Sequence, residues 1–415
     1  MDASQQDYDI IIVGGGMVGA SLALALGNQP FNVAMIEAYS HDLDTPPGYD
    51  DRAIALSYGS AQIFRTLNLW NQLSDNVTPI HQIHVSECGH MGITRIDHRQ
   101  ENVEALGYVI TARALGQVLY GALAQFENIH MIKPARLTGL SFTDDQAQAI
   151  VAINPDDEKQ TQQTIGARLL VAADGGNSSV RQMLDIDAQE QDYRQTAITA
   201  NISTELPHHN RAYERFTSQG PLALLPMGDD RQCSLVWTRH TENVDALLKL
   251  SDDQFLQQLQ REFGNRLGAF TRIGKRSTYP LKLVRAASQV RKRVALIGNA
   301  AHTLHPIAGQ GFNLGIRDVA ALAQILVDEH KAQRDIGLLG ALQTYQQWRQ
   351  EDHRRIIGFT DNLVRIFSNR FTPLAVARNL GLVATDVLPP VKHLLAKHTM
   401  GMAGTLPRLA RGLPL

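Results

Sequence analysis

The chain has little cysteine. Only Cys88 and Cys233 occur in 415 residues, far apart and outside any C-x-x-C pair. A disulfide framework needs more cysteines, and a structural zinc site needs closely spaced pairs of them, so the sequence favours neither. This usage fits a reducing compartment such as the cytoplasm, and both residues are expected to be packed thiols.

Long apolar runs and an excess of charge of one sign are also missing. No apolar stretch approaches the roughly 20 residues that a membrane-spanning helix needs. The segment Met1 to Asp7 is short and polar, and a glycine motif follows it directly, so no signal peptide is expected. With 39 basic and 41 acidic residues, no global field points to a nucleic acid as partner. We expect a soluble or at most peripheral protein of about two or three domains.

The first glycine motif follows an apolar run, Ile10 to Val13, which is typical of a buried parallel strand. In such a strand-to-helix turn, Gly14 permits the bend, Gly16 leaves room for a pyrophosphate, and Gly19 lets helix and strand pack closely. Glu37 ends the next apolar strand, 18 residues after Gly19. An acid there accepts the hydroxyls of an adenosine ribose, so the motif predicts a cofactor with a free 2′-OH.

Three polar residues between the first two motifs have two interpretations each. Arg52 precedes a run of small and apolar residues, and it either reaches back to the pyrophosphate or pairs with neighbouring acids on the surface. Helical periodicity runs from Ser60 to Leu73 and again from Val109 to Phe126, where it places Arg113 and Gln117 four residues apart on one face. These two residues either line a cofactor channel or are simply solvated.

Asp174 and Gly175 form a second junction, because they follow another apolar strand that ends a small β-meander from Ala135 to Ala172. The carboxyl end of a strand is where an α/β sheet places its ligand contacts. Taken alone, an Asp-Gly pair indicates only a turn.

A third junction begins at Gly298, where a strand gives way to small residues and then to a helix that reaches about Val327. The small residues allow a flat ligand to approach closely, and the amides at the start of the helix point towards it. For an isoalloxazine ring, this dipole would stabilise the negative charge of the reduced flavin. His302 and His305 lack the company of metal ligands, so local hydrogen bonding is the favoured interpretation for both.

The segment from Tyr193 to Arg285 alternates like an antiparallel sheet, with a hairpin at Met227 to Gln232 and a helix from Asp252 to Phe263. Inserted between cofactor-binding segments, it is a candidate for the substrate wall. Its large apolar residues either face a ligand or pack in the core, with core packing favoured for any one of them. They are Phe216, Leu222, Leu224, Leu225 and Trp237.

The C-terminal region, Asn362 to Leu415, is basic and amphipathic, with Asp386 as its one acid. Such a segment touches anionic lipid or a partner protein, or it packs on its own domain with a basic outer face.

The three junctions, in this order, resemble those of the group A flavoprotein monooxygenases, whose prototype is p-hydroxybenzoate hydroxylase. Within that group the closest likeness is to the ubiquinone-pathway hydroxylases, and it extends from about Tyr8 to Met400. It rests on three stretches of the sequence: Gly48 to Leu56, Glu214 to Met227, and His305 to Gly315.

The resemblance implies an α/β fold. A Rossmann-like FAD-binding domain, similar to p-hydroxybenzoate hydroxylase, would carry an inserted antiparallel β-sheet substrate domain and a helical C-terminus. We assign the FAD-binding domain to residues 1–80, 109–192 and 286–360, a β-excursion to 81–108, the substrate domain to 193–285, and the basic helical region to 361–415.

The resemblance also implies FAD, with NADH or NADPH as electron donor. Gly14, Gly16, Gly19, Glu37, Arg52, Arg113, Gln117, Asp174, Gly175, Asn299, Gly311 and Asn313 are its predicted binding residues. Arg52, Gly309, Gln310 and Gly311 are the predicted catalytic residues at the ring. Asn299 stands where the family usually has an aspartate that binds the ribityl chain. An amide oxygen still accepts that hydrogen bond, so the expected cost is about 1 kcal/mol.

The implied reaction is hydroxylation of an electron-rich polyprenyl phenol by O2, through a flavin C4a-hydroperoxide, with the oxidative chemistry supplied by the cofactor. No side chain in the sequence stands out as a base for the phenol. The alternatives are another ring hydroxylation of the same pathway, a dehydrogenase, or a non-catalytic FAD-binding assembly subunit. Membrane contact, a quinone-biosynthesis complex and a homo-oligomer remain open as associations.

Overall fold

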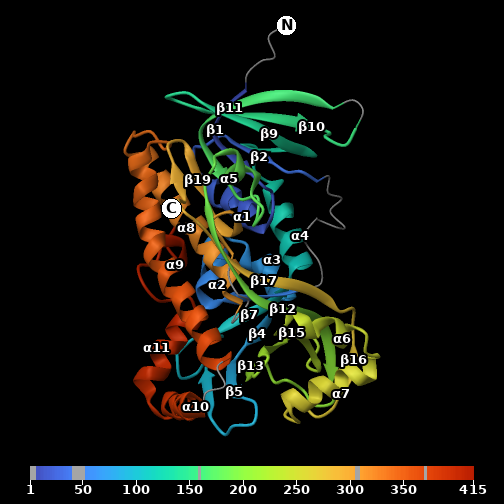
Figure 1. Cartoon of the computed structure of the whole chain (residues 1–415). Helices are drawn as coiled ribbons and strands as arrows, with labels where there is room; N and C mark the ends of the chain where they lie inside the picture. The colour runs from blue at the N-terminus through green and yellow to red at the C-terminus, as the bar shows by residue number, and fades with distance from the viewer. Residues whose placement is uncertain (1–5, 40–51, 158–159, 304–308, 369–371) are drawn as a thin grey trace.

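The computed structural model describes residues 6–39, 52–157, 160–303, 309–368 and 372–415. Two large β-sheets lie at opposite ends of the molecule, and a long helix, α9 (Leu339–Ser368), runs along one side (Figure 1). Because α9 contacts strands of both sheets, it braces one against the other. The predicted stretches Gly48 to Asp51 and Leu304 to Ala308, with His305, lie outside the described residues.

The centre of the first sheet is parallel and apolar. Its strands are, in order, β18 (Val290–Arg291), β19 (Val294–Leu296), β11 (Thr161–Ala172), β1 (Gln6–Val13), β2 (Val33–Ile36) and β8 (Ile129–Ile132). β18 is antiparallel, and so are β10 (Ala147–Ile153) and β9 (Ala135–Phe142), which extend from β11 as the predicted meander. Runs such as Ile10 to Ile12 are fully buried, as expected for parallel strands covered on both faces.

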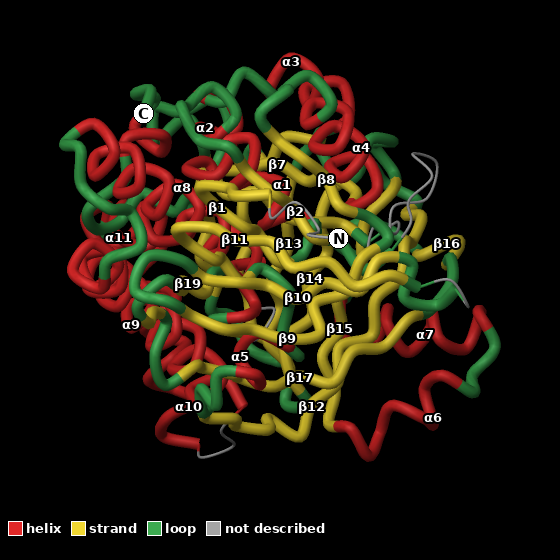
Figure 2. Tube along the Cα trace, turned by 90° about the horizontal axis from the view of Figure 1, so that it is seen from above, coloured by secondary structure: helices red, strands yellow, loops and turns green. Residues whose placement is uncertain are grey.

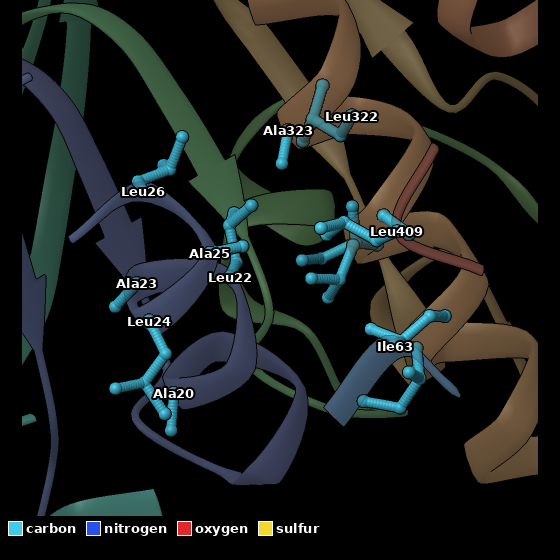
Figure 3. Close-up of a cluster of buried hydrophobic side chains, with 14 of the residues drawn as sticks. Ala20, Leu22, Ala23, Leu24, Ala25, Leu26, Ile63, Leu322, Ala323 and Leu409 are labelled. Carbon is cyan, nitrogen blue, oxygen red and sulfur yellow. The ribbon is translucent and has the colours of Figure 1, made fainter. Parts of the chain in front are cut away.

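Alternate residues of these strands enter two apolar clusters on opposite faces of the sheet. The larger cluster lies under the helices α1 (Met17–Leu26), α4 (Ala112–Leu123) and α8 (Gln310–Lys331). Figure 3 shows part of this cluster, to which Leu22 of α1, Leu322 of α8 and Leu409 of the C-terminal turn all belong. On the other face, the β9–β10 hairpin and α5 (Ser179–Met183) complete the cover.

The second sheet is mostly antiparallel, as predicted. Its order is β20 (His302–Thr303), β17 (Ser277–Ala286), β12 (Ala188–Thr204), β15 (Gln232–His240), β14 (Gly220–Pro226), β13 (Arg211–Thr217), β5 (Gln82–Glu87) and β6 (Ile93–Asp97). A short strand, β16 (Phe270–Ile273), pairs with β12. The excursion predicted at residues 81–108 therefore joins this same sheet, because β5 pairs in parallel with β13.

One face of the second sheet packs on α7, which spans Asp252–Phe263 as predicted. The short elements η2 (Thr241–Asn243) and α6 (Val244–Leu248) precede it. Seen from above, α6 and α7 lie outside the strands, on the side away from α9 and α11 (Figure 2). Buried Cys233 belongs to this layer, where burial raises the pKa of its thiol to about 12, as expected for a packed thiol.

Two predicted helices have different limits in the structure. The helix expected from Ser60 to Leu73 is split into α2 (Tyr58–Thr66) and α3 (Trp70–Leu73), because Asn68 between them has a left-handed φ of 59°. The helix expected from Val109 begins at Ala112, because the preceding residues form a strand and the Thr111 hydroxyl caps the helix. The strands of this small third sheet are β3 (Ala53–Ser57), β7 (Gly107–Thr111) and β4 (Thr78–Ile80).

The chain ends with α10 (Thr372–Val387), α11 (Pro389–Thr399) and the turn η5 (Arg408–Arg411). α10 packs against β6 of the second sheet, which places these helices beside the predicted substrate wall. Among the helices that the structure describes, none has both the length and the apolarity required to cross a bilayer.

Candidate active site

A cavity of about 780 Å³ lies where the glycine junctions of the first sheet meet one face of the second sheet and the helices α10 and α11. Its wall is mainly apolar. From the second sheet it includes Ile83, Val85, Phe216, Ala223, Leu225 and Val236. The cavity therefore joins the predicted cofactor junctions to the predicted substrate wall.

The first junction has the close packing that its spacing predicts. Gly14 has a φ of 101°, and a Cβ there would lie 2.6 Å from the carbonyl oxygen of Ala173. A Cβ on Gly19 would overlap the carbonyl oxygen of Gly14, which explains why a glycine is needed in this helix. Gly16 borders the cavity, and a Cβ there would meet nothing within 4 Å. Glu37 is buried and accepts a hydrogen bond of 2.6 Å from the backbone N–H of Gly15.

At the second junction, one oxygen of the Asp174 carboxylate accepts hydrogen bonds from the described residues and the other does not. Oδ2 of Asp174 accepts hydrogen bonds from the Ser179 hydroxyl at 3.0 Å and from the Val180 N–H at 3.2 Å. Oδ1 is buried, and no part of the chain that the structure describes donates a hydrogen bond to it. Beside it, Gly175 has a φ of 83° and borders the cavity with open space at its Cβ position.

Arg181 binds the second junction to the third. Its guanidinium donates to the carbonyl oxygen of Ala300 at 3.0 Å and to that of Gly176 at 2.7 Å. The third junction is the turn η3 (Gly298–Ala300), in which Asn299 is exposed and borders the cavity. Three segments that are distant in the sequence thus meet at the carboxyl end of the first sheet, where ligands bind in α/β folds.

The N-terminus of α8 is fixed to β3 by Asn313. Its side chain accepts a hydrogen bond from the N–H of Ser57 at 2.8 Å and donates to the carbonyl oxygens of Ala55 and Gly309, both at 2.7 Å. Gly309 takes a left-handed φ of 60° before the helix, and Gly311 borders the cavity with open space around it. The amides of this helix start are therefore held at the cavity wall.

Asp318, further along α8, is fully buried and accepts four hydrogen bonds. Oδ2 accepts from the Gly298 N–H at 3.0 Å and from His302 Nε2 at 2.7 Å, and Oδ1 accepts from Arg349 Nε and His353 Nε2, both at 2.8 Å. Burial alone would raise the pKa of Asp318, but His353, His302 and Arg349 hold it well below its usual range. His302 is thus engaged in local hydrogen bonding, as predicted.

The other predicted polar residues lie away from the cavity wall or serve the scaffold. Arg52 stacks on Tyr279, with its guanidinium carbon 4.8 Å from the ring centroid. Arg113 is half-buried in the first turn of α4, and Gln117 is exposed on the next turn. Gln310 is buried and donates to the carbonyl oxygen of Thr399 at 3.5 Å. Their roles at a cofactor stay predictions.

The alternation of the second sheet divides the predicted wall residues into two sets. Phe216 and Leu225 border the cavity. Leu222, Leu224 and Trp237 point to the opposite face and pack in the core with α7. Side-chain size could not separate the two sets, because the strand face decides the outcome.

Sequence reasoning missed Glu214 as a site residue. It lies on β13 between the buried residues Tyr213 and Phe216, and it borders the cavity. Burial raises the pKa of its carboxyl group to about 7. The signal in the sequence was a single acid between the large side chains of Tyr213 and Phe216, in a strand of the predicted substrate sheet.

The residues present fit a flavin dinucleotide. Open space at Gly16, Gly175 and Gly311 lies along one side of the cavity, where any larger side chain would intrude. Oδ1 of Asp174 is a buried acceptor without a hydrogen-bond donor in the described part of the chain, and a ribose or ribityl hydroxyl of the cofactor would supply one. The start of α1 and the start of α8 offer backbone amides for the phosphates and for the ring.

Comparison with known proteins agrees with this geometry. Residues 7–360 match the FAD binding domain family. The chain is 37% identical to the ubiquinone hydroxylase UbiL of Rhodospirillum rubrum, over 98% of this chain and 93% of that protein. It is 31% identical to the 3-demethoxyubiquinol 3-hydroxylase of Escherichia coli, over 96% of this chain and all of that protein.

Solved structures show the same fold at lower identity. The p-nitrophenol 4-monooxygenase PnpA of Pseudomonas putida superposes with a TM-score of 0.78 at 16% identity, covering 97% of this chain and 100% of that one. PqsL of P. aeruginosa, in complex with 2-aminobenzoylacetate, has a TM-score of 0.75 at 23% identity, covering 92% of this chain and 100% of that one. The chain therefore belongs to the FAD-binding aromatic monooxygenases and, within them, to the family of the ubiquinone-biosynthesis hydroxylases.

Proposed function

We propose that this enzyme hydroxylates the aromatic ring of a polyprenyl phenol of the 2-polyprenyl-6-methoxyphenol type in ubiquinone biosynthesis. The observation that carries the proposal is the cavity itself. It begins at the glycine junctions and continues between apolar strands to α10 and α11. A small polar phenol would not need so apolar an enclosure, whereas a prenylated ring does.

FAD is the cofactor, and when bound it supplies electron transfer from NAD(P)H and activation of O2. Gly16 and the start of α1 would hold the pyrophosphate, Glu37 the adenosine ribose, and Asp174 a hydroxyl near the second junction. Asn299 and Gly311 border the cavity where the ring would lie. The amides at the start of α8 would stabilise negative charge on the reduced ring.

The chain's own contribution is to orient the phenol and to exclude water from the reacting atoms. The phenol ring would lie between Gly311 and the face of the second sheet that carries Phe216 and Leu225. Its prenyl chain would extend past Leu382 and Leu395, which border the cavity from α10 and α11. The net reaction consumes one O2 and one NAD(P)H with a proton, and it releases the hydroxylated ring, NAD(P)⁺ and water.

A peripheral membrane contact is part of this proposal. Large apolar side chains are exposed on α10, on α11 and at the junction between them, in the same helices as Leu382 and Leu395 of the cavity, and the basic residue Lys397 of α11 is exposed as well. The exposed apolar residues are Val383, Val387, Leu388, Val391 and Leu394. An apolar face with basic neighbours suits the surface of an anionic bilayer, which is also where a polyprenyl substrate resides.

Sedimentation with vesicles tests this contact. The protein should sediment with phosphatidylglycerol vesicles more than with phosphatidylcholine vesicles, and a Val387→Glu, Leu394→Glu double variant should remain in solution. Leu206→Glu is the control, because Leu206 is also an exposed leucine but lies in the bend that follows β12 and not on α10 or α11. Equal sedimentation of all three proteins would contradict the contact.

The main test supplies the purified holoenzyme with 2-farnesyl-6-methoxyphenol and with NADH or NADPH. We expect phenol-dependent oxidation of the nicotinamide and a product heavier by one oxygen atom. Nicotinamide oxidation without an oxygenated product would indicate a dehydrogenase or an uncoupled oxidase. In a deletion strain, the ring intermediate that accumulates identifies the missing step, and a different intermediate would assign another hydroxylation of the pathway.

A pair of glycine variants tests the cofactor site. Gly16→Ala should weaken FAD binding by roughly tenfold or more, about 1.4 kcal/mol, because its methyl group enters the space reserved for the pyrophosphate. Gly121→Ala on α4 is the matched control, since a Cβ there also meets nothing within 4 Å but does not border the cavity. Unchanged FAD affinity in Gly16→Ala would remove Gly16 from the site. A non-catalytic FAD-binding subunit would bind FAD normally yet form no product.

A further inference from the structure

One ionisable side chain inside the cavity has no task in the reaction described above. Glu214 lies in the middle of β13, opposite Ala223 of β14 and Val85 of β5. Because side chains alternate along a strand, Glu214 shares its face with Ala212 and Phe216, and all three border the cavity. Tyr213 and Arg215 alternate to the other face, where Tyr213 packs in the core and Arg215 donates to the carbonyl oxygen of Glu262, although part of Tyr213 also borders the cavity.

The surroundings of Glu214 do not neutralise its charge. Within the described residues, no hydrogen bond or ion pair reaches its carboxyl group, and the facing side chains on β5, β14 and β15 are apolar. Arg378 of α10 is the other charged side chain that borders the cavity, and it pairs with Glu87. Arg95, Arg211 and Arg266 surround His84 and act on its pKa, not on that of Glu214.

The carboxyl group of Glu214 is half-buried on an apolar wall, where its charged form is poorly solvated, so a partner from outside the chain is the natural explanation. The proposed substrate brings a phenolic hydroxyl into the same enclosure. Among the described residues that border the cavity, Glu214 is the sole carboxylic acid, and there is no histidine, lysine or cysteine. It is therefore the one side chain on this wall that can exchange a proton with a phenol near neutral pH.

We propose that Glu214 accepts the phenolic proton of the substrate as the new carbon–oxygen bond forms, and returns it when the ring regains aromaticity. The proposal rests on the proposed function. Transfer of the proton leaves the electron pair of the O–H bond on the ring oxygen and raises electron density at the ortho and para carbons. One of these carbons gives its electron pair to an oxygen atom at the peroxide level, which bound FAD and NAD(P)H would supply from O2; the O–O bond breaks, and the second oxygen atom leaves as water.

The rest of the step balances on groups of the substrate and of Glu214. The carbon that gained oxygen still carries its hydrogen, and this hydrogen leaves as a proton to water. The electron pair of that C–H bond restores the aromatic ring, and the ring oxygen takes back the proton from Glu214. The carboxylate is regenerated for the next turnover, and no further oxidant or reductant is required.

The pKa of about 7 suits this role, because a base works best when its pKa is near the working pH. An unperturbed glutamate would be a weaker acceptor for a phenolic proton. The apolar wall therefore raises the basicity of the carboxylate, and the same wall encloses the ring.

The test compares wild type with Glu214→Gln, which keeps the size and polarity of the side chain but cannot take up a proton. We expect the holoenzyme carrying Glu214→Gln to hydroxylate 2-farnesyl-6-methoxyphenol about 100-fold more slowly. In wild type, kcat/KM should rise with pH and level off above about 7, whereas the variant should show no such rise. Glu214→Asp should recover part of the rate, because it restores a carboxylate.

Two measurements separate this role from a merely structural one. FAD content and the flavin absorption spectrum of Glu214→Gln should match wild type, and so should those of Glu190→Gln, an exposed glutamate on β12 that serves as control. The ultraviolet difference spectrum of the bound phenol should show phenolate character in wild type that increases with pH, and this change should be lost in Glu214→Gln.

The outcomes distinguish the two proposals. If wild type fails to hydroxylate the phenol, the proposed function falls and the role of Glu214 falls with it. If wild type is active and Glu214→Gln matches its rate and its pH profile, only the role of Glu214 is wrong. A wild-type difference spectrum that does not change with pH would also overturn that role.

Discussion

Two carboxylates, the fully buried Asp318 on α8 and the half-buried Glu214 on β13, have opposite surroundings. Asp318 accepts four hydrogen bonds, two of them from histidines and one from Arg349. Glu214 faces an apolar cavity with no partner among the described residues. Burial acts on both in the same direction, yet the pKa of Asp318 lies well below its usual range and that of Glu214 is raised to about 7.

The difference shows how one chain can use the same chemical group in two ways. A carboxylate whose two oxygens both accept hydrogen bonds stays in its charged form and holds neighbouring elements together, here the start of η3, α8 and α9. A carboxylate that accepts no hydrogen bond and faces an apolar wall has a pKa near neutrality, so it is available for proton transfer. The hydrogen-bonded neighbours, more than the depth of burial, therefore decide which carboxylate is structural and which is reactive.

Removing the structural carboxylate should have the largest effect. Among the described residues, Asp318→Asn leaves the buried Arg349 with Asp352 as its one charged partner, and breaking a buried pair in this way costs about 3–5 kcal/mol. Urea unfolding monitored by circular dichroism measures the loss. Asp328→Asn is the control on the same helix, because its pair with Arg408 is exposed and is worth about 0–1 kcal/mol. Equal losses in the two variants would refute the structural role.

Replacing the reactive carboxylate, Glu214, should raise the free energy of unfolding instead of lowering it. The pKa of Glu214 is about 7 in the folded state and 4.5 in the unfolded chain, so the folded state holds the proton between these values. Its contribution to stability is full below pH 4.5 and is lost as the pH rises through 7. Glu214→Gln should therefore be more stable than wild type at pH about 8, by about 1–3 kcal/mol.

Urea unfolding of the two proteins at a series of pH values provides the measurement. The two stabilities should converge as the pH falls towards 4.5, because both side chains are then neutral. A constant difference at all pH values would mean that packing, not ionisation, separates them.

Much of the first sheet could be predicted from the sequence because its signals are local. The glycines at positions 14, 16 and 19 follow an apolar strand; backbone sterics require Gly14 and Gly19, and Gly16 keeps the cavity beside them open. The start of α7 also has a local signal, the capping box formed by Ser251 and Gln254. The predicted ends of helices were wrong where a strand runs directly into a helix, as at Thr111, because the strand and the helix there share one continuous apolar pattern.

The candidate site was harder to predict, because it depends on which face of a strand points inward. Phe216 and Trp237 look alike in the sequence, yet one borders the cavity and the other packs on α7. The position of Glu214 at the cavity depends on the pairing of β13 with β5 and β14, which the sequence of β13 alone does not indicate. Asp318 and His353 meet by tertiary packing of α8 and α9, and no spacing in the sequence announces that contact.

The smallest expected effect is the coupling between the two carboxylates. Asp318 lies on α8 and Glu214 on β13, and no hydrogen-bond partner among the described residues is common to both, so their contributions to stability should add. At pH about 8, the double variant Asp318→Asn, Glu214→Gln should equal the sum of the single variants within about 0.5 kcal/mol. A larger coupling would mean that the scaffold around Asp318 transmits strain to the cavity. In that case the carboxylate of the network would also set the pKa of the one in the cavity, and the division between a structural and a reactive acid would no longer hold.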